Sequence, residues 1–342
     1  MAVVRIKHVA QRAGVSTGTV SNVLNQPDLV ASTTRQRVLD AIEELGFIRN
    51  ESARALRAGS SRIVALVVLD ATNPFFADIA RGAEQAADQH GSLLIVSDTH
   101  GDPKRERRIL AQLEEQRVQG ILITPVNAED PIFTRARQRK IPVVFVDSRQ
   151  EHHQHCAAAV EDVLGGRLAV DHLLARGHRR IWVAGGDDRL RQVRERREGA
   201  RQASISASLT DITITTLDTT ELSISAGREI GTQLVRQSTA DRPTAVFCVN
   251  DLLALGLMQE LQKANVKIPD DIAVVGYDDI EFASGALTPL TSLRQPSFEL
   301  GRTAAELLFA EIADGDHHAH RQVTFQPVLM LRDSTQPTGL LR

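Results

Sequence analysis

The chain has 342 residues, of which 42% are hydrophobic, 24% are charged and only 4% are aromatic. This length predicts two or three domains, and the composition is typical of folded globular proteins, which excludes a wholly disordered chain. No apolar run reaches the roughly 18 residues that span a bilayer, and the N-terminus lacks the pattern of a secretory signal. The two cysteines exclude a disulfide-framework protein. We therefore expect a cytoplasmic protein with no membrane partner.

Charge is distributed unevenly along the chain. Residues 1–62 carry nine Lys and Arg against five Asp and Glu, whereas the whole chain has a formal net charge of −3. A basic segment joined to an acidic remainder indicates that only the basic segment meets a polyanion such as nucleic acid. A chance fluctuation of charge over a short window is the alternative.

The basic segment predicts three short helices. The first covers about 6–12, after which a glycine stops it, because glycine tolerates the left-handed conformation of a tight turn. The second follows an N-cap at Ser16 and runs to about Asn25, with its apolar side chains on one face. The third follows an N-cap at Ser32, runs to Leu45 and ends before another glycine.

The first two helices, with a glycine turn between them, predict a helix-turn-helix. The second helix has a face of small polar side chains, which suits a helix that enters the major groove and bonds to base edges. Asn22 in particular can form two hydrogen bonds with adenine. A three-helix module that binds protein is the alternative. The candidate DNA-binding residues of this helix are Ser16, Thr17, Gly18, Thr19, Ser21, Asn22 and Asn25.

A further short helix is expected at about 50–58, in the sequence NESARALRA. A helix of this length is marginal on its own, because helix nucleation is costly. Its one large apolar side chain, Leu56, lies between two arginines, which suits a wedge in the minor groove with the arginines on the phosphates. Docking of Leu56 onto the rest of the chain is the alternative. The candidate DNA-binding residues here are Asn50, Ala53, Arg54, Leu56 and Arg57.

From Arg62 onward, short apolar strands alternate with amphipathic helices, which predicts parallel sheets with helices on both faces. Two sets of strands favour two lobes, and a single large doubly wound enzyme is the alternative. A helix at about 297–313 and a late strand at 322–331 indicate that the chain crosses again between the lobes. The expected strands are 63–69, 93–97, 121–124, 143–146, 181–184, 212–216, 245–249 and 273–276.

Several motifs stand in a distinctive order. HVAQRAGVSTGTVSNVLN and NESARALRAG are followed by VVLDATNPFF, AVFCVNDLLALGLMQEL and DIAVVGYDDIEFA. In this order the chain resembles the LacI/GalR family of bacterial transcriptional regulators over nearly its whole length. The resemblance implies an all-α helix-turn-helix head and an α/β body with the two-lobed fold of periplasmic binding proteins. The implied domains are a DNA-binding domain at 1–48, a hinge helix at 49–60, and an effector-binding and dimerisation domain at 61–342, with an N-lobe at about 61–158 and 294–323 and a C-lobe at about 159–293 and 324–342.

Polar residues follow several expected strands of the body. In parallel sheets, ligands bind beyond the carboxyl ends of the strands. Carboxylates and a guanidinium together suit a ligand rich in vicinal hydroxyl groups, although an N-cap or a surface-loop charge is the alternative at each position. The resemblance implies an effector role for Asn73, Phe76, Asp147, Arg196, Asn250 and Asp278. The full set of candidate effector-binding residues is Asp70, Asn73, Phe75, Phe76, Asp147, Arg196, Leu222, Asn250 and Asp278.

The chain departs from the family pattern in places. Leu222 stands where many relatives have a stacking aromatic residue, which favours a sugar or polyol over a flat purine. Asn22 stands where the best-known members carry arginine, so the operator sequence cannot be copied from them. Arg194 and Arg197 compete with Arg196 for the effector role. The end of the chain, GLLR, has no heptad repeat, so we expect a homodimer rather than a tetramer.

These features predict a transcriptional repressor that binds a palindromic operator in double-stranded DNA. Its operator affinity is expected to depend on a small-molecule effector, a sugar or polyol. A transporter-type sugar-binding protein and a DNA-tethered enzyme that modifies sugars are the rival functions. No nucleophile with a placed base and no glycine-rich phosphate loop is recognisable, so we expect neither an enzyme nor a cofactor.

Two histidine-rich stretches are the remaining candidates for chemistry. A zinc site is considered for the first of them but not assigned, because that stretch is expected to be an exposed connector. The second is expected to be a solvated loop. The residues are His152, His153, His155 and Cys156 in the first stretch, and His317, His318 and His320 in the second.

Overall fold

Two compact units make up the chain. The computed structural model describes residues 4–47, 61–150, 154–207 and 211–336, and the chain divides into units between Ser61 and Arg62. The helix expected at about 50–58 lies outside the described residues, and so do the candidates Asn50, Ala53, Arg54, Leu56 and Arg57. Within the described part of the chain, no helix is long and apolar enough to cross a membrane.

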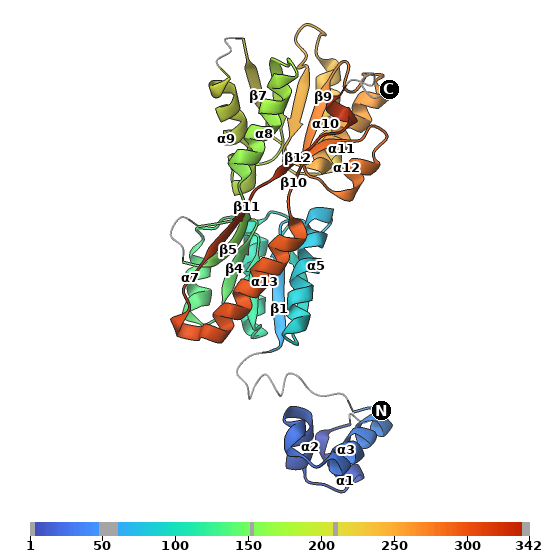
Figure 1. Cartoon of the computed structure of the whole chain (residues 1–342), viewed down its shortest axis with the longest axis vertical. Coiled ribbons are helices and arrows are strands. Elements are labelled where there is room, and N and C mark those ends of the chain that lie inside the picture. Colours follow the sequence, from blue (N-terminus) through green and yellow to red (C-terminus); the bar gives the residue numbers. More distant parts are fainter. Residues whose placement is uncertain (1–3, 48–60, 151–153, 208–210, 337–342) are drawn as a thin grey trace. The chain divides into compact units, whose positions relative to one another are not determined.

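The N-terminal unit is all-α (Figure 1). It packs around a small core of valine and alanine side chains, such as Val20 and Val38. Ser16 caps the second helix as predicted, because its hydroxyl accepts a hydrogen bond of 3.0 Å from the Thr19 N–H. Gly14 ends the first helix with a left-handed φ of 67°. The elements are α1 (Ile6–Ala13), α2 (Thr17–Asn25), the 3-10 turn η1 (Pro27–Leu29) and α3 (Ser32–Leu45).

The predicted N-cap of the third helix is wrong. Ser32 is the first helical residue, and Ala31 occupies the capping position without a side-chain hydrogen bond. The Ala31 carbonyl oxygen accepts hydrogen bonds from the N–H groups of Thr34 and Arg35. The backbone therefore starts α3 one residue earlier than a Ser32 cap would allow.

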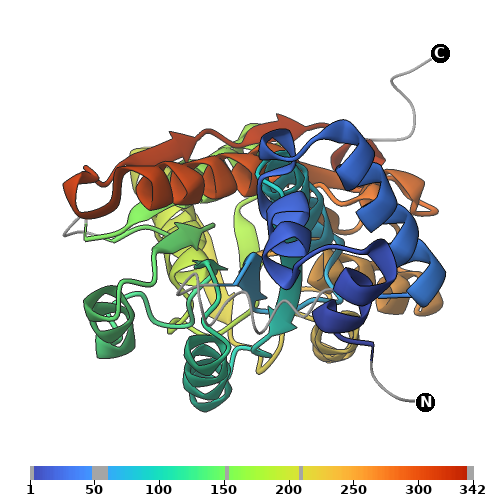
Figure 2. The same ribbon diagram turned by 90° about the horizontal axis from the view of Figure 1, so that it is seen from below.

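The N-lobe of the body is a six-stranded sheet whose neighbouring strands all run parallel. α5 and α13 cover one face of the sheet, and α6 and α7 cover the other face (Figure 2). Leu66 and Leu308 belong to the core on the first face, and Val67 and Phe133 to the core on the second. In sheet order the strands are β11 (Gln322–Phe325), β5 (Cys156–Val160), β4 (Val143–Val146), β3 (Gly120–Ile123), β1 (Ile63–Val68) and β2 (Leu93–Asp98), and the helices are α5 (Pro74–Gln89), α6 (Pro103–Glu115), α7 (Pro131–Gln138) and α13 (Ser297–Asp314).

The C-lobe repeats this architecture with a second six-stranded sheet. Its strands run parallel except for the last, which pairs antiparallel with its neighbour. In sheet order they are β12 (Val328–Met330), β10 (Thr291–Arg294), β9 (Ala273–Asp278), β8 (Ala245–Cys248), β6 (Arg180–Ala184) and β7 (Thr213–Leu217). The other elements are α8 (Asp162–Ala175), α9 (Arg191–Ser206), α10 (Ile224–Arg236), α11 (Asp251–Lys263), α12 (Glu281–Gly285) and the 3-10 turn η3 (Asp333–Thr335), while the turn η2 (Gly315–His317) follows α13 in the N-lobe.

The expected two-lobed α/β fold is confirmed, and the eight expected strands occur with ends displaced by no more than two residues. Two strands were not expected, β5 and β10, because an alanine-rich or polar stretch gives little strand signal. The single late strand at 322–331 is wrong. Pro327 has no N–H to donate to a ladder, and the chain there leaves β11 in the N-lobe and forms β12 in the C-lobe.

The chain crosses between the lobes after β5, after β10 and after β11. β5 extends to Val160 and β11 to Phe325, so the N-lobe continues slightly beyond the expected limits at 158 and 323. Because the chain passes between the lobes three times, each lobe is built from segments that are separate in the sequence. The pocket between the lobes is lined by residues of both.

Two helices of the C-lobe approach each other at glycines. A Cβ atom at Gly166 of α8 would collide with the Arg196 carbonyl oxygen, and one at Gly199 of α9 would collide with the Val163 carbonyl oxygen. Packed interiors cannot absorb such a collision without moving backbone. The two glycines therefore hold α9, and with it the Arg196 side chain, close to α8.

Gly199→Ala is expected to lower the free energy of unfolding by about 1–3 kcal/mol, because the two helix backbones must separate. Urea unfolding followed by circular dichroism measures this. Gly285→Ala is the matched control, because a Cβ at Gly285 of α12 meets nothing within 4 Å. Equal stability of the two variants would contradict the proposed close approach.

A buried carboxylate anchors α6 to the loop after β3. Glu106 is fully buried, and its Oε2 accepts a hydrogen bond of 2.8 Å from the Val126 N–H. Its other oxygen, Oε1, has no hydrogen-bond partner among the described residues. Burial raises the pKa of Glu106 to about 7, although the hydrogen bond from Val126 acts in the opposite direction.

Glu106→Gln is expected to stabilise the protein at pH 8 and to change little at pH 5. An acid whose pKa is raised in the folded state stabilises that state while protonated, and this contribution is lost as the pH rises from about 4.5 through 7. Glutamine keeps the acceptor for Val126 without a charge, so the expected gain at pH 8 is about 2–3 kcal/mol. Urea unfolding of both proteins at the two pH values checks this, and a gain that does not depend on pH would contradict it.

Candidate effector pocket and DNA-binding helix

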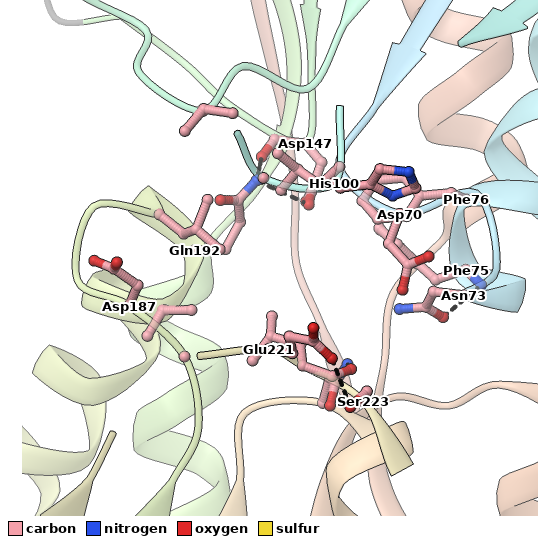
Figure 3. A pocket seen from close by; sticks show the side chains of 18 of the residues that line it. Asp70, Asn73, Phe75, Phe76, His100, Asp147, Asp187, Gln192, Glu221 and Ser223 are labelled. Carbon is pink, nitrogen blue, oxygen red and sulfur yellow. Dashed lines mark hydrogen bonds between the residues drawn. The ribbon is translucent and has the colours of Figure 1, made fainter. Parts of the chain in front are cut away.

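A cavity of about 370 Å³ lies between the lobes, at the carboxyl ends of the strands of both sheets (Figure 3). This is where ligands bind in open parallel sheets. All nine residues proposed from the sequence line this cavity: Asp70, Asn73, Phe75, Phe76, Asp147, Arg196, Leu222, Asn250 and Asp278.

Two of these residues also cap helices at the cavity wall. Asn73 precedes Pro74 at the start of α5, and its Oδ1 accepts a hydrogen bond of 3.0 Å from the Phe75 N–H. Asn250 caps α11 in the same way through Leu253, also at 3.0 Å. The capping role and a place on the cavity wall are therefore compatible, because a cap uses only the amide oxygen and leaves the NH2 group to other partners.

Two aspartates at strand ends have left-handed backbones. Asp147 follows β4 with a φ of 54°, and Asp278 ends β9 with a φ of 106°. Residues other than glycine rarely adopt such angles, which cost of the order of 1–3 kcal/mol and cluster at functional sites. Both residues contribute to the cavity wall.

Two pairs of side chains join the lobes across the cavity. The Asn73 Nδ2 group in the N-lobe donates to Asp278 Oδ2 in the C-lobe at 3.2 Å. The Gln192 Nε2 group in the C-lobe donates to the Asp147 carbonyl oxygen at 2.7 Å and to its Oδ2 at 3.1 Å, as Figure 3 shows. These bonds depend on the distance between the lobes, so a ligand that changes this distance must compete with them or reinforce them.

Arg196 is the central cation of the cavity wall. It is only 4% exposed. Its Nε donates to Asp162 Oδ1 and its Nη1 to the Val249 carbonyl oxygen, both at 2.7 Å. Its guanidinium carbon lies 3.7 Å from the centre of the Tyr277 ring. A buried charge of this kind is tolerated only because carboxylates and hydrogen bonds surround it.

The buried charges around Arg196 shift each other's titration. Burial raises the pKa of Asp278 to about 6, while the charge of Arg196 acts in the opposite direction. Burial, with the charge of Asp162, raises the pKa of Asp147 well above its usual value. Burial alone would lower the pKa of Arg196, but the surrounding negative charges, Asp162 foremost, raise it overall. The Arg196 guanidinium therefore stays charged. The carboxyl groups of Asp147 and Asp278 do not titrate independently of each other.

The structure separates the three arginines that compete in the sequence. Arg194 is exposed and donates to the Asp188 carbonyl oxygen. Arg197 binds Asp188 and Asp218 and backbone carbonyl oxygens near the end of β6. Neither lines the cavity, whereas Arg196 does. The reason is helical spacing, because these three neighbouring positions on α9 point in different directions and only that of Arg196 points toward Asp162 and the cavity.

Two acceptor atoms in the cavity wall are buried without a hydrogen-bond partner among the described residues. They are Oδ1 of Asp147 and Oε1 of Gln192. An unpaired buried polar atom costs about 1–3 kcal/mol. A ligand that donates hydrogen bonds at this point would remove that cost.

Sequence reasoning missed several residues of the cavity wall. Gln192 lies one helical turn before Arg196 on α9, and this i, i+4 spacing was the available signal. Further polar residues of the wall come from loops whose approach depends on the fold, so their positions in the sequence gave no signal. They include Thr72, His100, Asp187, Arg189 and Glu221.

The predicted recognition helix is α2 of the N-terminal unit. The side chains of Ser16, Thr17, Asn22 and Asn25 are exposed, as is Gly18, while Thr19 and Ser21 are half-buried. Asn25 is held by its own helix, because its Nδ2 donates to the Ser21 carbonyl oxygen at 2.8 Å. The face of α2 that carries these small residues and the exposed amide of Asn22 has the chemistry required to contact base edges.

Sequence comparisons agree with both halves of this description. The model of "Bacterial regulatory proteins, lacI family" matches residues 5–50, and that of "Periplasmic binding protein-like domain" matches residues 170–335. The HTH-type transcriptional repressor PurR of Photobacterium profundum is 34% identical over 332 residues, which cover 97% of this chain and 98% of that repressor.

Solved structures agree as well. The Lac repressor dimer bound to operator and the anti-inducer ONPF matches with a TM-score of 0.83 and 28% identity, over 98% of this chain and 99% of that one. The transcriptional regulator CelR–cellobiose complex matches with a TM-score of 0.70 and 29% identity, over 97% and 99%. The chain therefore belongs to the LacI family of bacterial regulatory proteins and is a DNA-binding transcriptional repressor with a helix-turn-helix head.

Proposed function

We propose that this repressor changes its operator affinity when a hydroxyl-rich small molecule, a sugar or polyol, binds between the lobes. The observation that carries the proposal is the pair of unpartnered buried acceptors, Asp147 Oδ1 and Gln192 Oε1. A hydroxyl group can donate to one acceptor and accept from the Arg196 guanidinium, which suits vicinal hydroxyls. The cellobiose complex of CelR supports the same class of ligand.

The coupling follows from the bonds between the lobes. A ligand that bonds to Asp147 and Gln192 changes the balance of the bonds that join the lobes, and so favours one arrangement of the lobes. We propose that a homodimer, of the kind the Lac repressor forms on its operator, converts this arrangement into operator affinity. Coupling of this kind is typically about 1–3 kcal/mol, or about 5- to 150-fold.

A flat heterocyclic base is the second candidate. Phe75 and Phe76 line the cavity and lie 5.1 Å apart, ring centre to ring centre, and Leu222 adds an apolar contact. Such rings can stack on a base. Thermal-shift measurements with sugars, polyols, nucleosides and free bases on the full-length protein separate the two candidates. Stabilisation by bases alone would overturn the sugar or polyol assignment.

Asp147→Asn is expected to weaken effector binding by more than tenfold, because it replaces the acceptor Oδ1 with a donor of the same shape. Asp316→Asn is the matched control, because Asp316 is an exposed carboxylate whose partner is Lys140. Calorimetric titration of the ligand found in the screen measures the change. Unchanged affinity of Asp147→Asn would show that this part of the cavity does not contact the effector.

Asn22→Ala is expected to weaken operator binding by about 5- to 150-fold, since a bidentate contact with a base is worth about 1–3 kcal/mol. Effector binding should not change. Fluorescence anisotropy on a duplex selected from a random pool with the full-length protein checks this, with Gln36→Ala on α3 as the control. If both variants kept the wild-type affinity and selectivity, α2 would not be the helix that recognises the operator.

A further inference from the structure

The N-lobe contains a second cluster of reactive side chains, at the edge of its sheet opposite to the effector cavity. Cys156, Glu311, His318 and His320 each offer one atom, and these four atoms lie within 4.8 Å of one another. Cys156 begins β5, at the amino edge of the sheet, whereas the effector cavity lies at the carboxyl edge. We propose that this cluster is a binding site for a transition-metal dication of the zinc type.

The cluster corrects two expectations from the sequence. His155 and Cys156 are buried rather than part of an exposed connector, and the His318 side chain is only 4% exposed rather than solvated. His155 is not part of the cluster, because its Nδ1 lies 3.2 Å from the Val143 carbonyl oxygen and its ring packs against Phe145. His152 and His153 lie outside the described residues. Folding therefore brings Cys156 to the other histidine-rich stretch instead.

The distances in the cluster suit tetrahedral coordination. Cys156 Sγ lies 3.2 Å from His318 Nε2 and 3.8 Å from His320 Nδ1, and His320 Nδ1 lies 3.8 Å from Glu311 Oε2. Zinc binds sulfur at about 2.3 Å and nitrogen or oxygen at about 2.0–2.2 Å, so its ligand atoms stand roughly 3.3–3.7 Å apart. All four atoms lie within 4.8 Å of one another, so side-chain movements of about 1 Å would bring them to the spacing of zinc ligands.

A feature of Glu311 points independently to a ligand. Its Oε2 is buried and has no hydrogen-bond partner among the described residues, and the side chain is only 12% exposed. Glu311 Oε2 lies 3.8 Å from His320 Nδ1, which is too long for a hydrogen bond. An unpaired buried carboxylate oxygen is costly, and a cation at the centre of the four atoms would remove the cost.

The surroundings of the cluster are those of a metal site. His318 directs Nε2 at the cluster, while its Nδ1 lies 2.9 Å from Asp314 Oδ2, the carboxylate–histidine arrangement that orients metal ligands. The Arg321 N–H donates to Cys156 Sγ at 3.3 Å, which fixes the position of the sulfur beside the other three ligand atoms. A thiolate and a carboxylate together balance the charge of a dication.

The chemistry of the donor set selects the metal. Thiolate and imidazole favour zinc and its neighbours, whereas calcium and magnesium prefer sites built from oxygen alone. Glu311 lies in the last turn of α13, His318 and His320 lie between α13 and β11, and Cys156 lies on β5, which pairs with β11. A bound ion would therefore hold the end of α13 and the following loop against strand β5.

Cobalt(II) is the probe for the test, because a thiolate ligand produces a sulfur-to-cobalt charge-transfer band in its absorption spectrum. We expect the chelator-treated full-length protein to bind one cobalt ion per chain with this band, and zinc to displace it. Cys156→Ser should lose the band. His318→Ala should weaken cobalt binding by more than tenfold, and Asp314→Asn by about 10- to 100-fold.

His317→Ala is the matched control, because His317 lies beside the cluster in sequence and is exposed. It should bind cobalt as the wild type does. Circular dichroism establishes that each variant is folded, and His318→Ala tests the site separately if the buried Cys156 does not tolerate serine. Absence of the band in the wild-type protein, or a band that persists in Cys156→Ser, would overturn the proposal, because surface histidines alone cannot produce it.

Discussion

The body of this repressor is organised around one buried cation. Arg196 is held by Asp162, by the Val249 carbonyl oxygen and by the face of Tyr277. Burying a guanidinium is costly unless all of these partners are in place. The ends of β8 and β9 and the start of α8 therefore have to meet α9 at one point, and the C-lobe side of the cavity follows from that requirement.

Glycines on α8 make this meeting possible. A Cβ at Gly165 would collide with the Tyr277 ring, and one at Gly166 with the Arg196 carbonyl oxygen. The same residues that allow two helices to pack closely thus position the central cation and its aromatic partner. Packing and the chemistry of the cavity cannot be varied independently here, because the atoms that carry them are in direct contact.

The two ends of the N-lobe sheet have different chemistry. The carboxyl edge carries the strained Asp147 with its unpaired Oδ1, and inter-lobe hydrogen bonds to Gln192 and from Asn73. The amino edge carries the cysteine, histidine and glutamate cluster beside β5 and β11. Both places contain buried acceptor atoms without a partner among the described residues, and a ligand that bonds to such an atom removes the cost of leaving it unpaired.

Short segments of the sequence were sufficient to predict many of the secondary-structure elements and several residues of the cavity wall. Hydrophobic periodicity identified eight strands of the body and the three helices of the N-terminal unit, and the positions after strand ends identified Asp147, Asn250 and Asp278 on the cavity wall. These inferences succeed because strand propensity, helix caps and the carboxyl edge of a parallel sheet are properties of short segments.

Contacts between distant segments could be decided only by the tertiary structure. The choice of Arg196 over Arg194 and Arg197 depends on which face of α9 meets Asp162, and the pairing of Gln192 with Asp147 depends on the approach of two lobes. Cys156 meets His318 across more than 150 residues of chain because β5 pairs with β11. Nothing in either stretch alone specifies that pairing, since strand order in a sheet arises from the burial of the whole core.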